Sequence, residues 1–443
     1  MTEAIRSEVY DEQKKTRAFL IGVNTQQEEN FSHSMEELKL LAQACDMEVI
    51  GCSVQNMPMQ NKALYIGSGK AKEIAGEAGC EKADLLIAND SLTPSQIRNL
   101  KDETGIAVMD RTTLILEIFA SRAKSREAML QVEVARLQYM LPRLVGLHDA
   151  LSRQGGGSGA MSNKGAGEKK LELDRRRIEH RLAELRKELR EVETERMTQQ
   201  KRREKSAIPR VALVGYTNAG KSTILNAMID AYTDDPDKKV LEKDMLFATL
   251  DTSVRSITPK ENKTILLSDT VGFIDKLPHG LVEAFRSTLS EAACADLILH
   301  VVDFSDPNYK EHMEVTRETL RQIGASEIPV FYVYNKADLA AQNDVEREET
   351  GILRVTEQAI YISAKQKIGI PELADEILKR VYAGNRICDV VIPFARGDLY
   401  SYLKEKANVL LESYQEDGIH VKVECGEADF GRIAPFIVQT ERD

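Results

Sequence analysis

The sequence lacks the features that mark membrane-spanning and secreted proteins. It has no apolar run near the roughly 20 residues that cross a bilayer, and its first residues, 1–6, contain no signal-peptide core. Its six cysteines, at positions 45, 52, 80, 294, 388 and 425, include no C-x-x-C pair. They predict reduced, mostly buried thiols and no zinc site. We therefore expect a cytoplasmic protein, with peripheral membrane association left open as an addition.

The chain also lacks an excess of positive charge. Its formal net charge is −11 at pH 7, which argues against nucleic-acid binding over the whole surface but is compatible with a local basic surface. Charged residues make up 30% and hydrophobic residues 42%, a globular composition. At roughly 150 residues per domain, a chain of 443 residues predicts two to four domains.

A glycine-rich loop is the strongest motif. It has the pattern G-x-x-x-x-G-K-[ST] and consists of Gly215, Tyr216, Thr217, Asn218, Ala219, Gly220, Lys221 and Ser222. The apolar run 211–214 before it predicts a buried strand, and 223–229, starting at Thr223, predicts a helix. Backbone N–H groups in such a loop, backed by a helix N-terminus, bind phosphates. Lys221 is expected to reach the β- and γ-phosphates and Ser222 to ligate Mg²⁺. The flanking strand and helix disfavour the alternative, a chance glycine-rich turn.

Two later segments supply the residues expected to respond to the γ-phosphate. The first contains Phe247, Ala248 and Thr249, and Thr249 suits closure over the γ-phosphate and Mg²⁺. The second ends the predicted strand 263–268 and consists of Asp269, Thr270, Val271 and Gly272. Asp269 is expected to hold Mg²⁺ through water, and Gly272 to donate its N–H to the γ-phosphate. The predicted catalytic residues are thus Lys221, Thr249 and Gly272, and the predicted metal ligands are Ser222, Thr249 and Asp269.

Two further motifs predict that the base is guanine. The predicted strand 330–334 leads into Asn335, Lys336 and Asp338. A carboxylate there accepts from guanine N1–H and its 2-amino group, donors that adenine lacks. Ser363, Ala364 and Lys365 follow another strand, and the Ala364 N–H can meet guanine O6. The ordered set predicts GTP and GDP, not ATP, as the ligands.

Strands alternate with helices before the nucleotide domain, which predicts a parallel α/β domain. The expected strands are 17–23, 48–54, 83–88 and 106–110, and Ser34 is expected to cap the first helix. The glycines of 65–70 precede a helix, but G-x-G alone is a weak nucleotide signal and favours a tight turn.

Residues 111–147 and a second stretch ending near 205 have helical periodicity, with apolar seams that predict an antiparallel hairpin. The glycine-rich stretch 152–167 between them predicts a flexible tip loop. Arg175, Arg176 and Arg177 make the second helix locally basic. Two interpretations stay open at this point: a solvated face with i,i+4 ion pairs, or a surface for RNA phosphates.

The predicted fold class is a multidomain α/β protein with four domains. These are an N-terminal parallel α/β domain (17–110), a long antiparallel helical hairpin with a glycine-rich tip (111–205), a P-loop GTPase domain (206–386) and a small α/β C-terminal domain (387–443). The last shows no pattern typical of catalysis and is expected to be a docking module.

The motif set resembles the HflX family of ribosome-associated GTPases, which split stalled or idle ribosomes. The carrying stretches outside the nucleotide domain are 65–70, 92–96, 110–112, 130–135, 141–144 and 151–157; those inside it are 215–222, 247–251 and 269–273. The resemblance implies a GTP hydrolase that is slow alone and stimulated by the ribosome. It also implies a monomer that binds rRNA of the large ribosomal subunit through the N-terminal domain and the hairpin. The expected function is GTP-dependent splitting or recycling of ribosomes, with hydrolysis linked to release. One alternative is a large-subunit assembly or hibernation switch without splitting activity. The other is an ATP-driven RNA remodeller, against which the motif of Asn335, Lys336 and Asp338 argues.

The sequence departs from the family pattern at several positions. Ala166 stands where the family usually has Pro, and Thr252 stands where Pro is common. Phe273 occupies the place where many related GTPases have a water-orienting Gln, which predicts slow intrinsic hydrolysis.

Asn218 lies where an Asn in similar GTPases helps to bind K⁺ near the phosphates. The alternative is that Asn218 only braces the loop.

Overall fold

The computed structural model describes residues 15–26, 30–154, 161–204, 208–233, 246–247, 253–276, 291–340 and 353–441. The described residues form two compact units. The first comprises those up to 197 with 246–247 and 276, and the second comprises the others. Each unit is described by itself.

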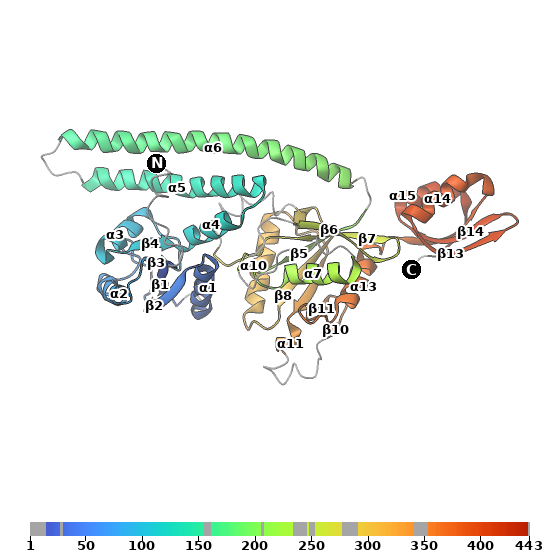
Figure 1. The fold of residues 1–443 in the computed structure, drawn as a ribbon, viewed down its shortest axis with the longest axis horizontal. Coiled ribbons are helices and arrows are strands. Elements are labelled where there is room, and N and C mark those ends of the chain that lie inside the picture. Colours follow the sequence, from blue (N-terminus) through green and yellow to red (C-terminus); the bar gives the residue numbers. More distant parts are fainter. Residues whose placement is uncertain are drawn as a thin grey trace. The chain divides into compact units, whose positions relative to one another are not determined.

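A four-stranded parallel sheet forms the centre of the first unit (Figure 1). Its strands are β1 (Arg17–Asn24), β2 (Glu48–Asn56), β3 (Leu85–Ala88) and β4 (Ala107–Asp110), in the order β2-β1-β3-β4. Helices α1 (Phe31–Ala44), α2 (Ser68–Cys80) and α3 (Pro94–Thr104) alternate with them. The alternation predicted from the sequence is confirmed, and all three strand pairs are parallel.

The predicted cap of the first helix is wrong. Helix α1 begins at Phe31 after Asn30, which places Ser34 inside the helix. Ser34 is buried, and its hydroxyl accepts a hydrogen bond from Nδ2 of Asn89 at 2.9 Å. A serine is compatible with a helix interior when its hydroxyl has a partner there. Thr93, in contrast, caps α3 and forms a full capping box with Gln96.

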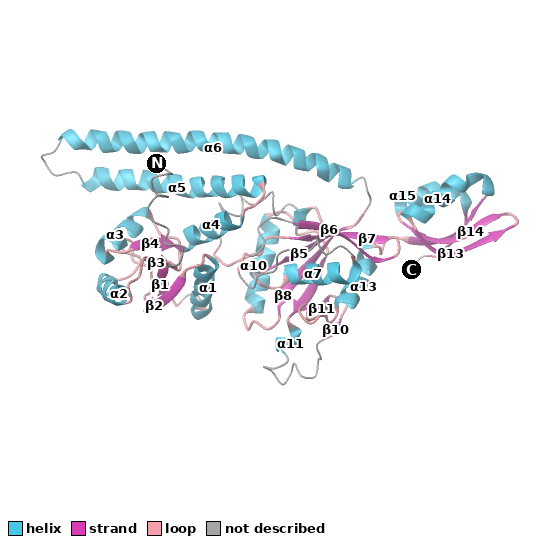
Figure 2. Ribbon diagram, viewed as in Figure 1, coloured by secondary structure: helices cyan, strands magenta, loops and turns pink. Residues whose placement is uncertain are grey.

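Three helices follow the sheet: α4 (Arg111–Arg122), α5 (Arg126–Gln154) and α6 (Met161–Glu204). Helices α5 and α6 run side by side (Figure 2). The predicted seam holds them together, because Leu130, Val134, Leu182 and Leu185 form a buried cluster. The partly buried residues packed on it are Leu137, Leu141, Ile178, Leu189 and Val192.

The predicted tip loop 152–167 is too long. Helix α5 continues to Gln154 and α6 starts at Met161, so residues 161–167 are helical. Extending an existing helix is far less costly than starting one, and each glycine adds only about 1 kcal/mol of penalty. Ala166 also keeps the backbone N–H that a proline would remove. The tip residues 155–160 lie outside the described residues.

The second unit contains a seven-stranded sheet in the order β10-β11-β9-β8-β5-β7-β6. Its parallel strands are β5 (Arg210–Gly215), β7 (Lys263–Asp269), β8 (Leu297–Asp303), β9 (Val330–Asn335) and β11 (Ala359–Tyr361). Strands β6 (Ser253–Lys260) and β10 (Arg354–Val355) pair antiparallel at the two edges. The helices include α7 (Lys221–Tyr232), α10 (Tyr309–Gln322), α11 (Ala337–Ala340) and α13 (Ile370–Val381).

The C-terminal part of this unit has its own core and an antiparallel sheet, ordered β13-β14-β12-β15. The strands are β12 (Arg386–Ile392), β13 (Asn408–Gln415), β14 (Gly418–Cys425) and β15 (Ile437–Glu441). Helices α14 (Gly397–Lys406) and α15 (Glu427–Ile433) contribute to the same core. Among the helices described, none is both long and apolar enough to span a membrane.

Candidate active site

The glycine-rich loop connects the end of β5 to the start of α7, as predicted from the sequence. Its outer glycines are required by close contacts. A Cβ atom at Gly215 would lie 2.1 Å from the carbonyl oxygen of Val301, and one at Gly220 would lie 2.2 Å from Nδ2 of Asn335. Gly220 and Asn218 also have positive φ values of 92° and 61°. The strand ends and the neighbouring motif therefore fix the shape of the loop.

Lys221 is prepositioned for phosphate binding by the loop that contains it. Its Nζ donates to the carbonyl oxygens of Gly215 and Tyr216, at 3.1 and 2.9 Å. The side chain is buried, and this burial lowers the pKa of Lys221 to about 8, while the Asp269 carboxylate acts in the opposite direction. Phosphate oxygens would restore a full positive charge, because a nearby anion favours the charged form.

Ser222 and Asp269 come together although they are 47 positions apart in the sequence. The Ser222 hydroxyl donates to Oδ2 of Asp269 at 2.6 Å, and Asp269 is fully buried at the end of β7. A hydroxyl and a carboxylate are hard oxygen donors of the kind that Mg²⁺ prefers. The two side chains therefore fit the predicted metal site. Thr249 and Ala248 lie outside the described residues.

The segment after β7 lies directly on the phosphate loop. The Thr217 N–H donates to the carbonyl oxygen of Phe273 at 2.7 Å, and the Phe273 N–H donates to that of Gly215 at 3.1 Å. A Cβ atom at Gly272 would lie 2.7 Å from Cα of Thr217 and 3.1 Å from Nζ of Lys221. Thr270 is anchored to β5 through the carbonyl oxygen of Leu213, and Val271 is buried. Only glycine fits this close approach.

The two predicted guanine motifs lie next to the phosphate loop and are joined by Asn335. Its Nδ2 donates to the carbonyl oxygen of Ala219 at 2.9 Å, and its Oδ1 accepts the Ala364 N–H at 3.0 Å. Lys336 pairs with Asp303 at 2.7 Å, and Asp338 accepts a hydrogen bond from Gln366 at 3.1 Å. Ser363 is buried, and Lys365 is exposed.

Three contacts escaped the sequence analysis. The link from Asn335 to the phosphate loop carries no local pattern. Asp303 ends β8 next to the motif at the end of β9, so its position at a strand end could have suggested the pair with Lys336. Phe247 is buried in the first unit, where its ring meets Phe119 of α4 edge-on with 4.7 Å between ring centres.

Known proteins are similar to this chain over nearly its whole length. Residues 32–120 match the family described as "GTP-binding GTPase N-terminal", 122–203 match "GTP-binding GTPase Middle Region", and 210–336 match "50S ribosome-binding GTPase". The GTPase HflX of Caldanaerobacter subterraneus is 45% identical over 426 residues, which cover 96% of this chain and 94% of that protein. The chain belongs to the HflX family of GTPases.

Two other proteins are also similar to this chain. The GTPase HflX of Lacrimispora saccharolytica is 39% identical over 98% of both chains. A GTP-binding protein from Sulfolobus solfataricus, whose crystal structure was determined in complex with GDP, is 27% identical in sequence. The aligned part covers 83% of this chain and 99% of that protein, with a TM-score of 0.43. Membership in the HflX family confirms the resemblance noted from the motifs, and it makes the protein a GTP hydrolase.

Proposed function

We propose that this GTPase binds the large ribosomal subunit and splits or recycles ribosomes in a GTP-dependent manner, with hydrolysis linked to its release. The observation that carries the proposal is the match of 210–336 to a family described as "50S ribosome-binding GTPase", over residues that contain the phosphate loop, Asp269 and Asn335. The N-terminal domain and the helical hairpin are the proposed contacts with rRNA, and the protein is proposed to act as a monomer.

The proposal keeps four domains with the bounds 17–110, 111–205, 206–386 and 387–443. Separate buried clusters support this division. One surrounds the parallel sheet of the first unit, one lies in the seam between α5 and α6, and two more lie in the nucleotide-binding and C-terminal parts of the second unit. A domain needs a core of its own, and each region has one.

For hydrolysis we assign binding and positioning roles to the chain's own residues. Lys221 holds the β- and γ-phosphates, Gly272 donates its N–H to the γ-phosphate, and Thr249 closes over it. Ser222, Thr249 and Asp269 are the proposed Mg²⁺ ligands; the ion, when bound, neutralises charge on the phosphates. Phe273 has no group that can orient an attacking water, so hydrolysis is slow until the large subunit supplies that group.

Asp338, Ser363, Ala364 and Lys365 are the proposed contacts with guanine, together with Asn335 and Lys336. The hydrogen bond from the Ala364 N–H to Oδ1 of Asn335 supports this assignment only in that it keeps the two base motifs together. Replacing GTP by ATP would leave the Asp338 carboxylate without the two donors that guanine offers. Such an unpaired polar group discriminates strongly between ligands.

Asn218 is the proposed contact for a K⁺ ion beside the phosphates. Its side chain is exposed and therefore not part of the buried core. Its backbone has a φ of 61°. A cation there would offset charge that develops during hydrolysis. Equal GTPase rates in KCl and NaCl at the same ionic strength would rule the cation out and leave Asn218 as a brace of the loop.

A sucrose-gradient profile of intact bacterial-type ribosomes tests the main proposal. The full chain is added with a non-hydrolysable GTP analogue, with GDP, or with no nucleotide. Free subunits with the analogue but not with GDP support a splitting factor whose hydrolysis serves release. Intact ribosomes, with the protein comigrating only on added large subunits, would instead indicate an assembly or hibernation switch.

A further inference from the structure

The phosphate-loop residue Tyr216 makes two contacts that no motif predicts. Its ring stacks on His312 of α10, with 3.8 Å between ring centres and 10° between ring planes. Its hydroxyl accepts the backbone N–H of Asp275 at 2.9 Å. Tyr216 and His312 are both buried, with 7% and 9% of their surface exposed, so neither ring is free to move without loss of packing.

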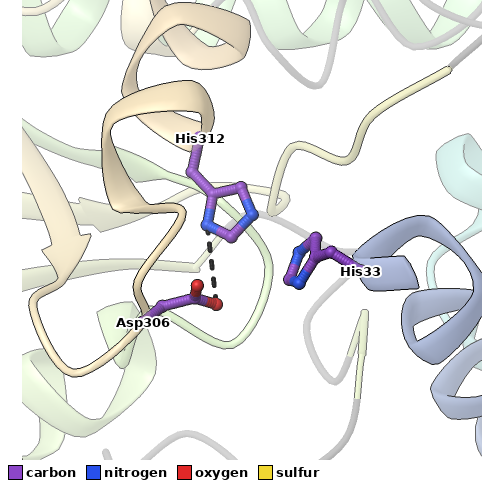
Figure 3. Close-up of side chains that lie close together, drawn as sticks. All are labelled: His33, Asp306 and His312. Atoms are coloured by element: carbon purple, nitrogen blue, oxygen red, sulfur yellow. Dashed lines mark ion pairs between the residues drawn. The ribbon is translucent and has the colours of Figure 1, made fainter. Parts of the chain in front are cut away.

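His312 also has an acidic neighbour. Its Nδ1 lies 3.9 Å from Oδ2 of Asp306, which precedes α10 (Figure 3). The backbone of this turn is itself ordered, because the Asp306 carboxylate accepts the Asn308 N–H at 2.8 Å. The imidazole of α10 thus packs face to face on the ring of Tyr216, with the Asp306 carboxylate nearby. His33, also drawn in Figure 3, belongs to the other unit.

The hydroxyl of Tyr216 adds one hydrogen bond to the backbone pairing between the phosphate loop and residues 273–275. Tyr216 and Phe273 form a parallel β-bridge, flanked by the Thr217–Phe273 and Phe273–Gly215 hydrogen bonds. These bonds occupy the Thr217 N–H, and Gly272 lies against Thr217 and Lys221. A γ-phosphate held by Nζ of Lys221 has to enter beside this contact, whereas GDP has no group there.

We propose that Tyr216 and His312 form a latch that holds residues 273–275 on the phosphate loop until a γ-phosphate, to which the Gly272 N–H donates, opens the pairing of Phe273 with Gly215 and Thr217. His312 is a positioning residue: it fixes the ring of Tyr216, and the Tyr216 hydroxyl fixes the Asp275 backbone. The latch favours the GDP-compatible arrangement, so it lowers the affinity for GTP relative to GDP. A ligand shifts such an equilibrium only through its different contacts with the two arrangements. The inference rests on guanine-nucleotide binding and is independent of ribosome splitting.

Tyr216→Phe in the full chain is the direct test, because it keeps the stacked ring and removes only the hydroxyl. Titrations with a fluorescent non-hydrolysable GTP analogue and with fluorescent GDP give both affinities. We expect the analogue to bind about fivefold more tightly, the factor that one net hydrogen bond of typical strength contributes. The affinity for GDP is expected to stay at the wild-type value. An unchanged ratio of the two affinities would overturn the proposal, as would a change that both share.

A matched pair of variants at His312 tests the other half of the latch. His312→Phe keeps an aromatic ring against Tyr216, so the affinity ratio should stay near wild type. His312→Ala removes the stack and should shift the ratio in the same direction as Tyr216→Phe. The double variant Tyr216→Phe/His312→Ala should shift it no further than the larger single effect, because the two residues act through one contact. Additive shifts, or a shift in His312→Phe equal to that in His312→Ala, would contradict a latch.

Discussion

At the scale of single residues, Asn335 connects the base motif to the phosphate loop. Asn335→Ala would leave the Ala219 carbonyl and the Ala364 N–H without their present partner in a buried place. Unsatisfied buried groups cost about 1–3 kcal/mol each. We expect the affinity for GDP and for a GTP analogue to fall together by about tenfold, because Asn335 is a proposed guanine contact and joins the base motifs to the phosphate loop; ~1.4 kcal/mol is a factor of ten. Fluorescence titration measures both.

Lys367→Ala in the following loop is the matched control. Lys367 is 61% exposed and pairs with Asp230 at the surface, so its loss should change either affinity less than about twofold. A normal nucleotide affinity in Asn335→Ala would show that the link between the two loops is dispensable.

The grouping of the candidate site residues was largely predictable because each motif follows a strand and requires a specific backbone shape. The sequence identified Lys221, Ser222, Asp269 and Gly272, and the structure places these four around one loop. The stack of Tyr216 on His312 was not predictable. The two residues are far apart in the sequence, and a histidine within a polar helix shows no periodic signal of its partner.

At the scale of elements, Arg143 fastens α5 to the sheet of the first unit. Its Nη2 lies 2.5 Å from Oδ2 of Asp110, which is fully buried at the end of β4 and also accepts the Tyr139 hydroxyl. Arg143→Met would leave a buried carboxylate without its cation. Removing one partner of a buried pair costs about 3 kcal/mol or more. We expect the free energy of unfolding of the first unit to fall by that amount in denaturant titrations at pH 7.

The same pair predicts a dependence on pH. Burial acts to raise the pKa of Asp110, but hydrogen bonds and charge from Arg143, with Thr113 and Tyr139, outweigh it and hold the pKa below its usual value. The stabilisation from Asp110 is therefore complete above the unfolded pKa of about 3.9 and is lost as the pH falls through the lower folded pKa.

Arg136→Ala on the same helix is the control for Arg143→Met: its pair with Glu117 is half exposed, and its loss should cost below about 1 kcal/mol. Equal costs for the two variants would refute the prediction.

The packing of α6 on α5 depends on a few leucines. Leu185 is fully buried in the seam, whereas Leu173 on the same helix is 54% exposed. Leu185→Ala should destabilise the helical pair by about 2–4 kcal/mol, the range for a buried leucine. Leu173→Ala should cost below about 0.5 kcal/mol, as surface changes usually do. Hydrogen exchange of the α5 and α6 amides measures both; similar protection in the two variants would show that the seam is not what holds the helices together.

At the scale of the whole molecule, the order of elements was predictable where strands and helices alternate. The four-stranded parallel sheet and the parallel strands of the seven-stranded sheet follow from that alternation, since a parallel connection needs a crossover helix. The C-terminal sheet did not follow: β13, with mostly exposed residues, and the short β15 give no strong period-two pattern. The start of α6 was missed because the cooperativity of helix extension outweighs the penalty of its first glycines.

The whole chain carries a net charge of −11, so any attraction to RNA has to come from a local surface. On α6, Arg175 pairs with Glu179 at 2.9 Å, Arg176 with Glu172 at 3.0 Å and Arg177 with Asp174 at 3.6 Å. These pairs are what a solvated helix face would show. Yet the three arginines remain 47%, 71% and 80% exposed, and a guanidinium has more N–H donors than one carboxylate uses.

Replacing Arg175, Arg176 and Arg177 together by Gln separates the two interpretations. Each phosphate contact contributes about 0.7–0.9 to the slope of log K against log salt concentration. If all three bind rRNA, the slope for binding to purified large subunits should become shallower by about 2. Arg321→Gln on α10, which removes an equally exposed arginine paired with Glu318, should leave the slope unchanged. A triple variant with the wild-type slope would mean that these arginines serve only the helix, and that the contact with the subunit must come from another surface.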